Sequence, residues 1–265
     1  MDEGAAMTDR IAYMAIAISL ALLTVSCAER NPGVFITANI LPSSDCLVTP
    51  DGARLFGGVL DTGLAQATNP TSPYVVYPLY QNQLQNRASL APLRSDANGF
   101  SVLGAKVELI GADGRTLALP GGLVNPYTIS AGESTYVPSA AGNEVVSQPG
   151  ALEIIPSQYV EALDTIVQDT GGGFNLVAIV TAFGVTSGDN NIELNDWQWS
   201  IRVMRLGLID FVSGDDPETA EVCDAPEPPG VKQCKPLGTD QVVDCRYCKF
   251  SGNAEVAACC GQGHC

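Results

Sequence analysis

The sequence of 265 residues contains a single histidine, His264, and lacks the short motifs that mark common catalytic sites. Nucleophilic triads of the Ser-His-Asp or Cys-His kind would have to use this histidine. It lies between Gly263 and Cys265, a poor place to hold an imidazole in a fixed orientation. No G-x-S-x-G, P-loop or H-E-x-x-H pattern occurs. The sequence therefore offers no motif for a catalytic centre.

Basic residues are also scarce. Lysine and arginine total 13 against 29 aspartates and glutamates, which gives a net charge of −16. A surface of this sign repels the phosphate backbone, so we expect no nucleic-acid partner. The charge suits a soluble domain that projects from an anionic membrane, or one that meets cationic partners or divalent ions.

The longest uncharged run near the start, residues 11–25 (IAYMAIAISLALLTV), is too short for a membrane span, which needs about 20 apolar residues. Its length suits the apolar part of a secretory signal, which is followed by small residues at the cleavage point. The acidic residues Asp2, Glu3 and Asp9 before Arg10 do not suit such a signal. A true start at Met7 instead of Met1 would remove most of that acidity.

Residues 23–27 (LTVSC) resemble the bacterial lipobox, the signature of diacylglyceryl-modified lipoproteins. Ser26 and Cys27 match the pattern well, whereas Thr24 stands where leucine is commonest. The resemblance implies removal of residues 1–26, a thioether-linked lipid on Cys27 and a short tether over residues 27–33. Ala28, in place of aspartate, favours the outer membrane. The alternative is a plainly secreted protein whose first cysteine forms a disulfide.

The number of cysteines also supports export from the cytoplasm. Nine cysteines are present, and one lipidated residue leaves an even set, which in an exported chain predicts four disulfides. The pairing is open. Since all but one of the eight follow residue 222, we expect Cys46 to connect the main domain to the C-terminal segment. The eight are Cys46, Cys223, Cys234, Cys245, Cys248, Cys259, Cys260 and Cys265.

The body of the chain, residues 34–212, alternates short apolar runs with clusters of Gly, Pro, Asn and Asp. This pattern is typical of sheet proteins with frequent turns. We predict a mainly β fold, a two-layer antiparallel sandwich of immunoglobulin-like or related Greek-key type. A jelly roll or open barrel is the alternative. Strands are predicted at 34–40, 74–80, 101–110, 115–119, 151–155, 175–185 and 192–206.

Three local features are more specific. Residues 112–114 (ADG) predict a tight hairpin turn, since Asp-Gly readily adopts positive φ angles. A change of phase along 192–206 predicts a bulge at residues 195–196. One helix is expected from Ser157, which could cap it, with Glu161 in the first turn and an end at the glycines 171–173.

Residues 213–265 hold seven cysteines and few large apolar side chains, which predicts a small appendage stapled by disulfides. Cys245 and Cys248 form a C-x-x-C pair that a zinc site or a redox centre could use. The poor spacing of Cys259, Cys260, His264 and Cys265 argues against zinc. No βαβ context supports a redox role, so structural disulfides are the preferred interpretation.

Two further clusters are ambiguous. Acidic loop residues at 189–193, and Asp96 with Asn98, could bind calcium, but turn chemistry explains them equally well. Trp197 and Trp199 lie two apart and face one side of a strand. They are either core anchors, which we prefer, or an exposed aromatic contact for a sugar or peptide.

Together these features predict an extracytoplasmic lipoprotein, anchored in the bacterial outer membrane through Cys27 with no other cofactor or metal. Its expected role is that of a non-catalytic binding or structural module with an envelope protein or glycan as partner. The alternative is an envelope hydrolase that uses two carboxylates.

Overall fold

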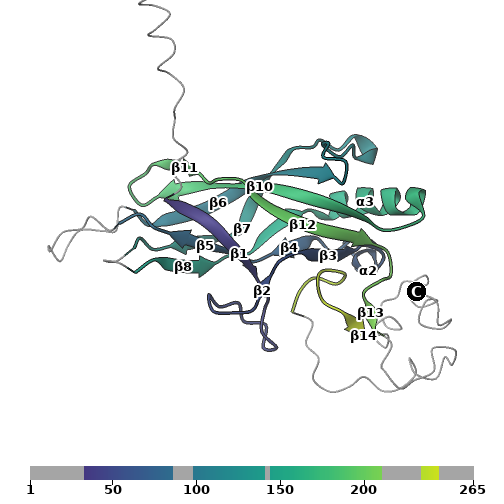
Figure 1. Ribbon diagram of the computed structural model, residues 1–265, viewed down its shortest axis with the longest axis horizontal. Coiled ribbons are helices and arrows are strands. Elements are labelled where there is room, and N and C mark those ends of the chain that lie inside the picture. The colour runs from purple at the N-terminus through teal and green to yellow at the C-terminus, as the bar shows by residue number, and fades with distance from the viewer. Residues whose placement is uncertain (1–32, 86–97, 141–143, 211–233, 245–265) are drawn as a thin grey trace, which may run out of the picture. The chain divides into compact units, whose positions relative to one another are not determined.

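The structure is a computed structural model that describes residues 33–85, 98–140, 144–210 and 234–244 (Figure 1). The predicted signal, Cys27 and most of the cysteine-rich segment lie outside these residues. In the described part the chain is mainly β, with two curled sheets that form a sandwich, as the sequence predicts. The predicted fold class is confirmed.

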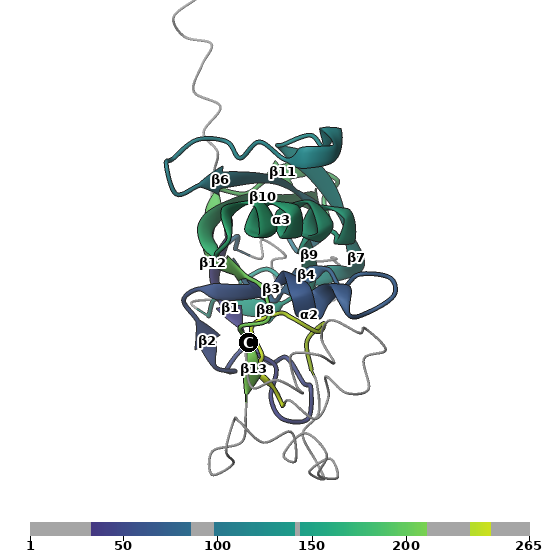
Figure 2. The same cartoon turned by 90° about the vertical axis from the view of Figure 1, so that its right-hand side faces the viewer.

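The larger sheet has the order β3-β12-β10-β6-β7, with β11 paired to β10. Its pairs are antiparallel except at the edge, where β3 runs parallel to β12 with Ile201 opposite Gly58. Figure 2 shows this sheet above β1 and β8 of the other layer. The strands are β3 (Gly58–Asp61), β6 (Phe100–Gly111), β7 (Tyr127–Val137), β10 (Phe174–Thr186), β11 (Asn191–Glu193) and β12 (Trp197–Met204).

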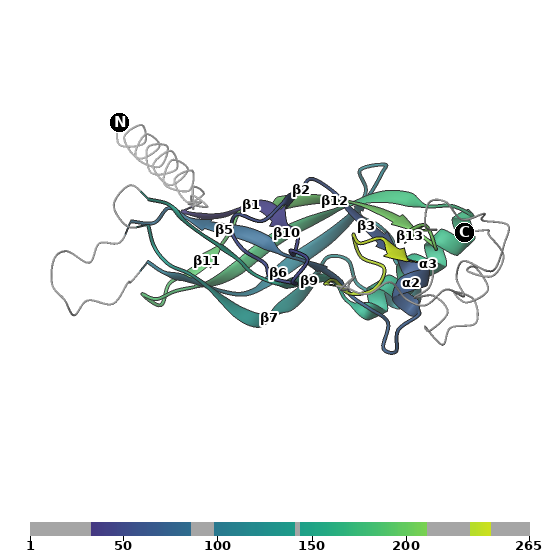
Figure 3. The same cartoon turned by 90° about the horizontal axis from the view of Figure 1, so that it is seen from below.

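The smaller sheet has the order β2-β1-β5-β8, and two pairs, β4-β9 and β13-β14, stand apart from it. Strand β7 forms one edge of the larger sheet (Figure 3). Strand β8 forms one edge of the smaller sheet. The strands are β1 (Val34–Ile40), β2 (Arg54–Leu55), β4 (Tyr74–Val76), β5 (Pro78–Asn82), β8 (Val146–Pro149), β9 (Leu152–Ile155), β13 (Ile209–Asp210) and β14 (Val243–Asp244).

The core lies between the sheets and is closed at one end by helices. Val107, Leu109, Val180 and Ile201 from the larger sheet are buried in one cluster with residues of β4, β9 and helix α3 (Ser157–Thr170). Along β12 buried residues alternate with exposed or half-buried ones, as a half-covered sheet requires. A second, shorter helix, α2 (Thr62–Gln66), packs against α3 at the same end (Figure 1).

The predicted turn and bulge are both present. Gly114 has φ +76° in the turn that follows β6, and its N–H bonds to Gly111 O at 2.9 Å. The segment after that turn makes only a bridge, Ile110 with Thr116, so the strand predicted at 115–119 is wrong. Between the β10–β11 and β10–β12 pairings, three residues after Glu193 face two on β10, which is a bulge of one extra residue.

Helix α3 begins and ends where the sequence predicts, but its capping is different. Gly171, at φ +65°, ends the helix as a left-handed C-cap. Pro156 is the N-cap residue, and no side chain caps the helix. The Ser157 hydroxyl instead donates to Thr71 O at 2.5 Å, so Ser157 ties the helix to the loop before β4. Glu161 lies beyond the first turn. The proposed roles of Ser157 and Glu161 were therefore wrong.

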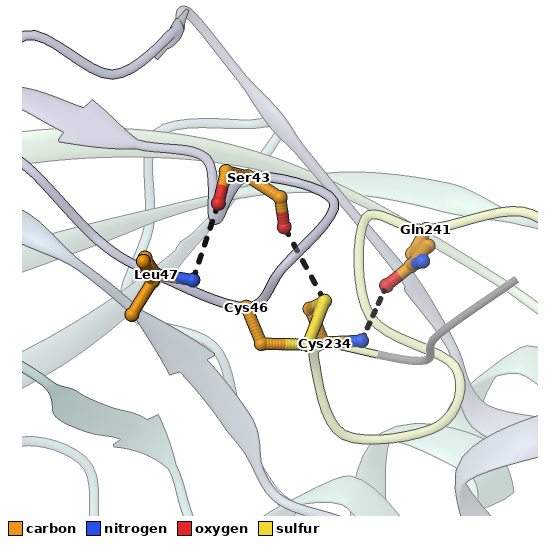
Figure 4. The surroundings of a disulfide bond; sticks show 5 residues. All are labelled: Ser43, Cys46, Leu47, Cys234 and Gln241. Carbon is orange, nitrogen blue, oxygen red and sulfur yellow. Dashed lines mark hydrogen bonds between the residues drawn. A yellow bond between two sulfur atoms is a disulfide. The ribbon is translucent and has the colours of Figure 1, made fainter. Parts of the chain in front are cut away.

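A disulfide joins Cys46 to Cys234 over 188 positions of sequence (Figure 4). It links the loop after β1 to the segment 234–244, as expected for a staple between the main domain and the C-terminal segment. Figure 4 shows Cys234 N–H donating to Gln241 Oε1 at 3.1 Å, and the sulfur of Cys234 lies 3.4 Å from Ser43 O. The other six cysteines that the sequence assigns to disulfides lie outside the described residues.

Candidate binding groove

Two adjoining hollows follow the line where the edges of the two layers meet. The first has a volume of about 330 Å³ and is lined by Ile129, Ser130 and Gly132 of β7 and by residues of β9. The second has a volume of about 350 Å³ and includes Thr135 and Tyr136 of β7. Both are open to solvent and share Ala151. We call the two hollows together the edge groove.

The edge groove exists because β7 lies alongside β8 and β9 without joining them in one sheet. Figure 2 shows β7 next to β9. The Tyr127 hydroxyl donates to Ile154 O at 2.6 Å, which ties β7 to β9 at one end. Further along, Gly150 allows the chain between β8 and β9 to approach β7 closely, because a Cβ on residue 150 would lie 2.2 Å from Thr135 Oγ1. Between these ties the two edges leave room for a ligand.

The walls of the second hollow combine an aromatic side chain with neutral hydrogen-bonding groups. Tyr136 is 43% exposed on β7, and Gln148 lies opposite on β8. Tyr77 is half-buried between β4 and β5, and burial raises the pKa of its phenol, which therefore stays neutral. Val48 belongs to the loop that the Cys46–Cys234 disulfide holds, so the staple also positions one wall of the groove.

Glu153 is the only acid among the described side chains that line either hollow. Burial raises the pKa of its carboxyl, because the charged form loses solvation. We expect carbon-13 NMR to show Glu153 titrating at a higher pH in the folded chain than in the unfolded chain. A folded-state pKa above the unfolded value means that the ionised carboxyl disfavours folding as pH rises through that pKa. Glu153→Gln should remove this pH dependence, and an equal midpoint in the folded and unfolded chain would contradict the expectation.

The fully buried carboxylates elsewhere are committed to the fold. Asp61 accepts bonds from the backbone N–H groups of Leu64, Leu206 and Leu208. Asp164 lies 3.2 Å from Arg205 Nε and accepts from the hydroxyl of Thr62 at 2.6 Å. Nothing in the described part of the chain thus places a second available carboxylate beside Glu153, as a hydrolase with paired carboxylates would need.

A third buried carboxylate, that of Asp240, lies in a cluster behind β3. It forms an ion pair with Lys235, and it accepts from the Tyr74 hydroxyl at 2.8 Å and from Val59 N–H at 2.6 Å. Gly58 makes this possible, since a Cβ there would lie 1.8 Å from the Tyr74 oxygen. The cluster fixes segment 234–244 to the sandwich. No local pattern indicates the cluster, because Asp240 lies 166 positions from Tyr74 and 181 from Val59.

The two tryptophans have different surroundings. Trp199 is 3% exposed, and its Nε1–H donates to the Tyr74 oxygen at 3.1 Å. Trp197 is half-buried and stacks on Trp199 with ring centroids 5.3 Å apart. Trp199 is therefore a core anchor and cannot belong to an exposed aromatic contact. A ligand contact by Trp197 alone stays a prediction.

Iodide quenching tests this placement. In the variant Trp197→Phe only Trp199 emits, and we expect blue-shifted fluorescence that iodide barely quenches, because water and ions do not reach the ring. Trp199→Phe leaves the half-buried Trp197 and should be quenched more strongly. Equal quenching of the two variants in the folded state would contradict the burial of Trp199.

The remaining predicted sites are the two acidic clusters, His264 and the C-x-x-C pair. Asp189 lies in the turn between β10 and β11, where it has φ +64° and its N–H bonds to Thr186 O, whereas Glu193 is the last residue of β11. Within the described ranges, no group of three or more His, Cys, Asp or Glu is placed to hold a metal ion. Asn98 donates to Gln85 O at 2.6 Å. Asp96, His264 and the C-x-x-C pair lie outside the described residues.

The groove was not predicted from the sequence because β7 has no continuous strand pattern. Tyr127 and Ile129 alternate with polar residues and would have indicated a strand, but the alternation breaks off within 131–134, where β7 bulges away from β6. Tyr136 and Gln148 have no pattern of their own. Only the meeting of the two sheet edges brings them together.

Comparison with known proteins adds little. No family model matches the chain, and no curated protein matches it. A Northeast Structural Genomics Consortium target, SoR45, aligns at 10% identity over 54% of this chain and 82% of its own, with a TM-score of 0.23. A protein from Archaeoglobus fulgidus aligns at 9% identity over 49% of this chain and 84% of its own, with a TM-score of 0.26. Likenesses this weak carry no conclusion.

Proposed function

We propose that this chain is a lipid-anchored binding module of the bacterial cell envelope, with the edge groove as its ligand site. The observation that carries the proposal is the pair of adjoining hollows, about 330 and 350 Å³, at the edges of the sandwich. Sites for small ligands have volumes of this order. The role is non-catalytic, because the described carboxylates that are buried serve the fold.

The anchor is supported by the sequence. The apolar run 11–25 and the lipobox-like residues 23–27 favour export and lipid attachment at Cys27. A disulfide in the described part of the chain suits an oxidising compartment outside the cytoplasm. Stable anchoring needs more than one acyl chain, which a diacylglyceryl group supplies. No described helix is long and apolar enough to cross a bilayer.

A neutral glycan is the ligand that the groove suits best. Ser130, Thr135 and Gln148 offer uncharged donors and acceptors for sugar hydroxyls. Tyr136 offers a partly exposed ring for the apolar face of a sugar. The net charge of −16 disfavours an anionic polymer. The two hollows in line fit a short chain of sugar units better than a single compact molecule.

Calorimetric titration tests the proposal. The full chain, exported with Cys27→Ser so that it stays in solution, is titrated with neutral oligosaccharides of two to six units. We expect Tyr136→Ala and Gln148→Ala each to weaken binding about tenfold or more, the effect of losing about 1.4 kcal/mol of contact energy.

The controls replace matched residues away from the groove. Phe56→Ala removes a ring that is 93% exposed, and Gln198→Ala removes an exposed amide on β12. Both should bind like the parent chain. The proposed ligand site is wrong if the groove variants bind as well as the controls. The glycan class is wrong if no oligosaccharide binds at millimolar concentration.

A further inference from the structure

Segment 234–244 places a lysine and an aspartate together inside the protein. The side chains of Lys235 and Asp240 are 0% and 3% exposed, and Nζ lies 2.5 Å from Oδ2. Removing two charges from water costs several kcal/mol for each ion. The fold therefore holds an amine nitrogen in direct contact with a carboxyl group.

Hydrogen-bond donors hold the Asp240 carboxyl at the oxygen where negative charge would develop if a nucleophile attacked its carbon. The Tyr74 hydroxyl lies 2.8 and 3.0 Å from the two carboxyl oxygens, and Val59 N–H donates to Oδ1 at 2.6 Å. Trp199 Nε1–H donates to the Tyr74 oxygen and orients it. Two donors fixed on one carboxyl oxygen stabilise the oxyanion that forms when a nucleophile attacks the carbon.

The backbone fixes the two side chains in this position. Gly238 has φ +82°, and the Asp61 N–H donates to its carbonyl at 2.7 Å. The Asp240 N–H donates to Val59 O at 2.9 Å. Since one carbon–oxygen bond spans about 1.2 Å, Nζ lies less than about 4 Å from the Asp240 Cγ. Reacting groups held this close gain much of the rate advantage of an intramolecular reaction.

We propose that Lys235 and Asp240 condense to an intramolecular isopeptide bond. One proton passes from Nζ to the carboxyl, the Nζ lone pair attacks Cγ, the carbon–nitrogen bond forms, and one carbon–oxygen bond breaks. The departing hydroxyl takes a second proton from the nitrogen, which lies 2.5 Å from Oδ2, and leaves as one water molecule. Atoms and charges therefore balance. No oxidant, metal or cofactor takes part. The proposal is independent of the groove and of the lipid anchor.

Intact mass tests the proposal directly. The exported full chain is reduced, alkylated and denatured, so that disulfides no longer affect its mass. We expect the mass to be lower than that of the processed sequence by one water. After cleavage at Leu237, the pieces that carry Lys235 and Asp240 should stay joined, and fragmentation should place the branch at these two residues.

Variants sharpen the test. Lys235→Arg keeps the positive charge but should not condense. This variant should therefore have the full mass of its processed sequence, with no loss of water. Lys106→Arg changes an exposed lysine on β6 and should keep the water loss. Asp240→Asn should lose ammonia instead of water if condensation occurs. The wild-type branched peptide is measured in denaturant, so the test stands even if a variant does not fold. A full wild-type mass, or a water loss located elsewhere, overturns the proposal.

Discussion

Replacing both Cys46 and Cys234 by serine is expected to lower the free energy of unfolding by about 4 to 5 kcal/mol. The physical reason is the 188-position separation of the two cysteines, because a crosslink over a long loop removes much conformational entropy from the unfolded chain. Denaturant unfolding of the exported chain measures the change. The size of this effect is a large part of the total stability of an ordinary domain.

The single variants provide the control. Cys46→Ser and Cys234→Ser remove the same bond, so each should cost about as much as the double variant, and their effects should not add. Losses that add, or a double variant that loses less than about 1 kcal/mol, would contradict the structural role of the staple. The double variant should also bind a ligand more weakly in the edge groove, since Val48 lies on the loop that the disulfide holds.

Replacing Asp61 by alanine is expected to destabilise the chain by about 3 to 5 kcal/mol, because it leaves two buried backbone N–H groups and one partly buried one without an acceptor. Asp61 is fully buried and accepts at 3.1, 2.7 and 2.9 Å from Leu64, Leu206 and Leu208. One carboxylate thus caps α2 and also holds the chain after β12. Thermal and denaturant unfolding measure the loss.

Two further variants provide comparisons for the loss of stability in Asp61→Ala. Asp61→Asn keeps one oxygen as acceptor but turns an amide toward one of the N–H groups, so it should show an intermediate loss. Asp169→Ala removes an exposed acid at the end of α3 and should change stability by less than about 0.5 kcal/mol. A loss for Asp61→Ala no larger than that for Asp169→Ala would show that the three bonds are not structural.

Much of the fold could be predicted because it depends on local sequence signals. Strand β1 matches the apolar run 34–40, Gly114 supplies the turn after β6, and Gly171 ends α3. These features follow from side-chain alternation and from the freedom of glycine to adopt positive φ. The Cys46 staple followed from counting cysteines. In each case the signal lies within a few residues or in a single residue type.

The features that could not be predicted depend on contacts between distant segments. Ser157 looks like a helix cap in the sequence, but its hydroxyl bonds to Thr71 O instead. Strand β3 joins β12 in parallel, a pairing that no local pattern indicates. Lys235 would be taken for a solvated charge, yet the fold buries it beside Asp240. Long-range packing thus decides the sites, whereas local chemistry decides the elements.

The central claim is that a lipid on Cys27 holds this stapled sandwich at a bacterial membrane. Mass spectrometry of the N-terminal peptide, from protein extracted out of the membrane fraction, tests it most directly. The account predicts a mature chain that begins at Cys27, with a diacylglyceryl thioether on its sulfur. A mature N-terminus at another residue, or Cys27 without lipid, would contradict it.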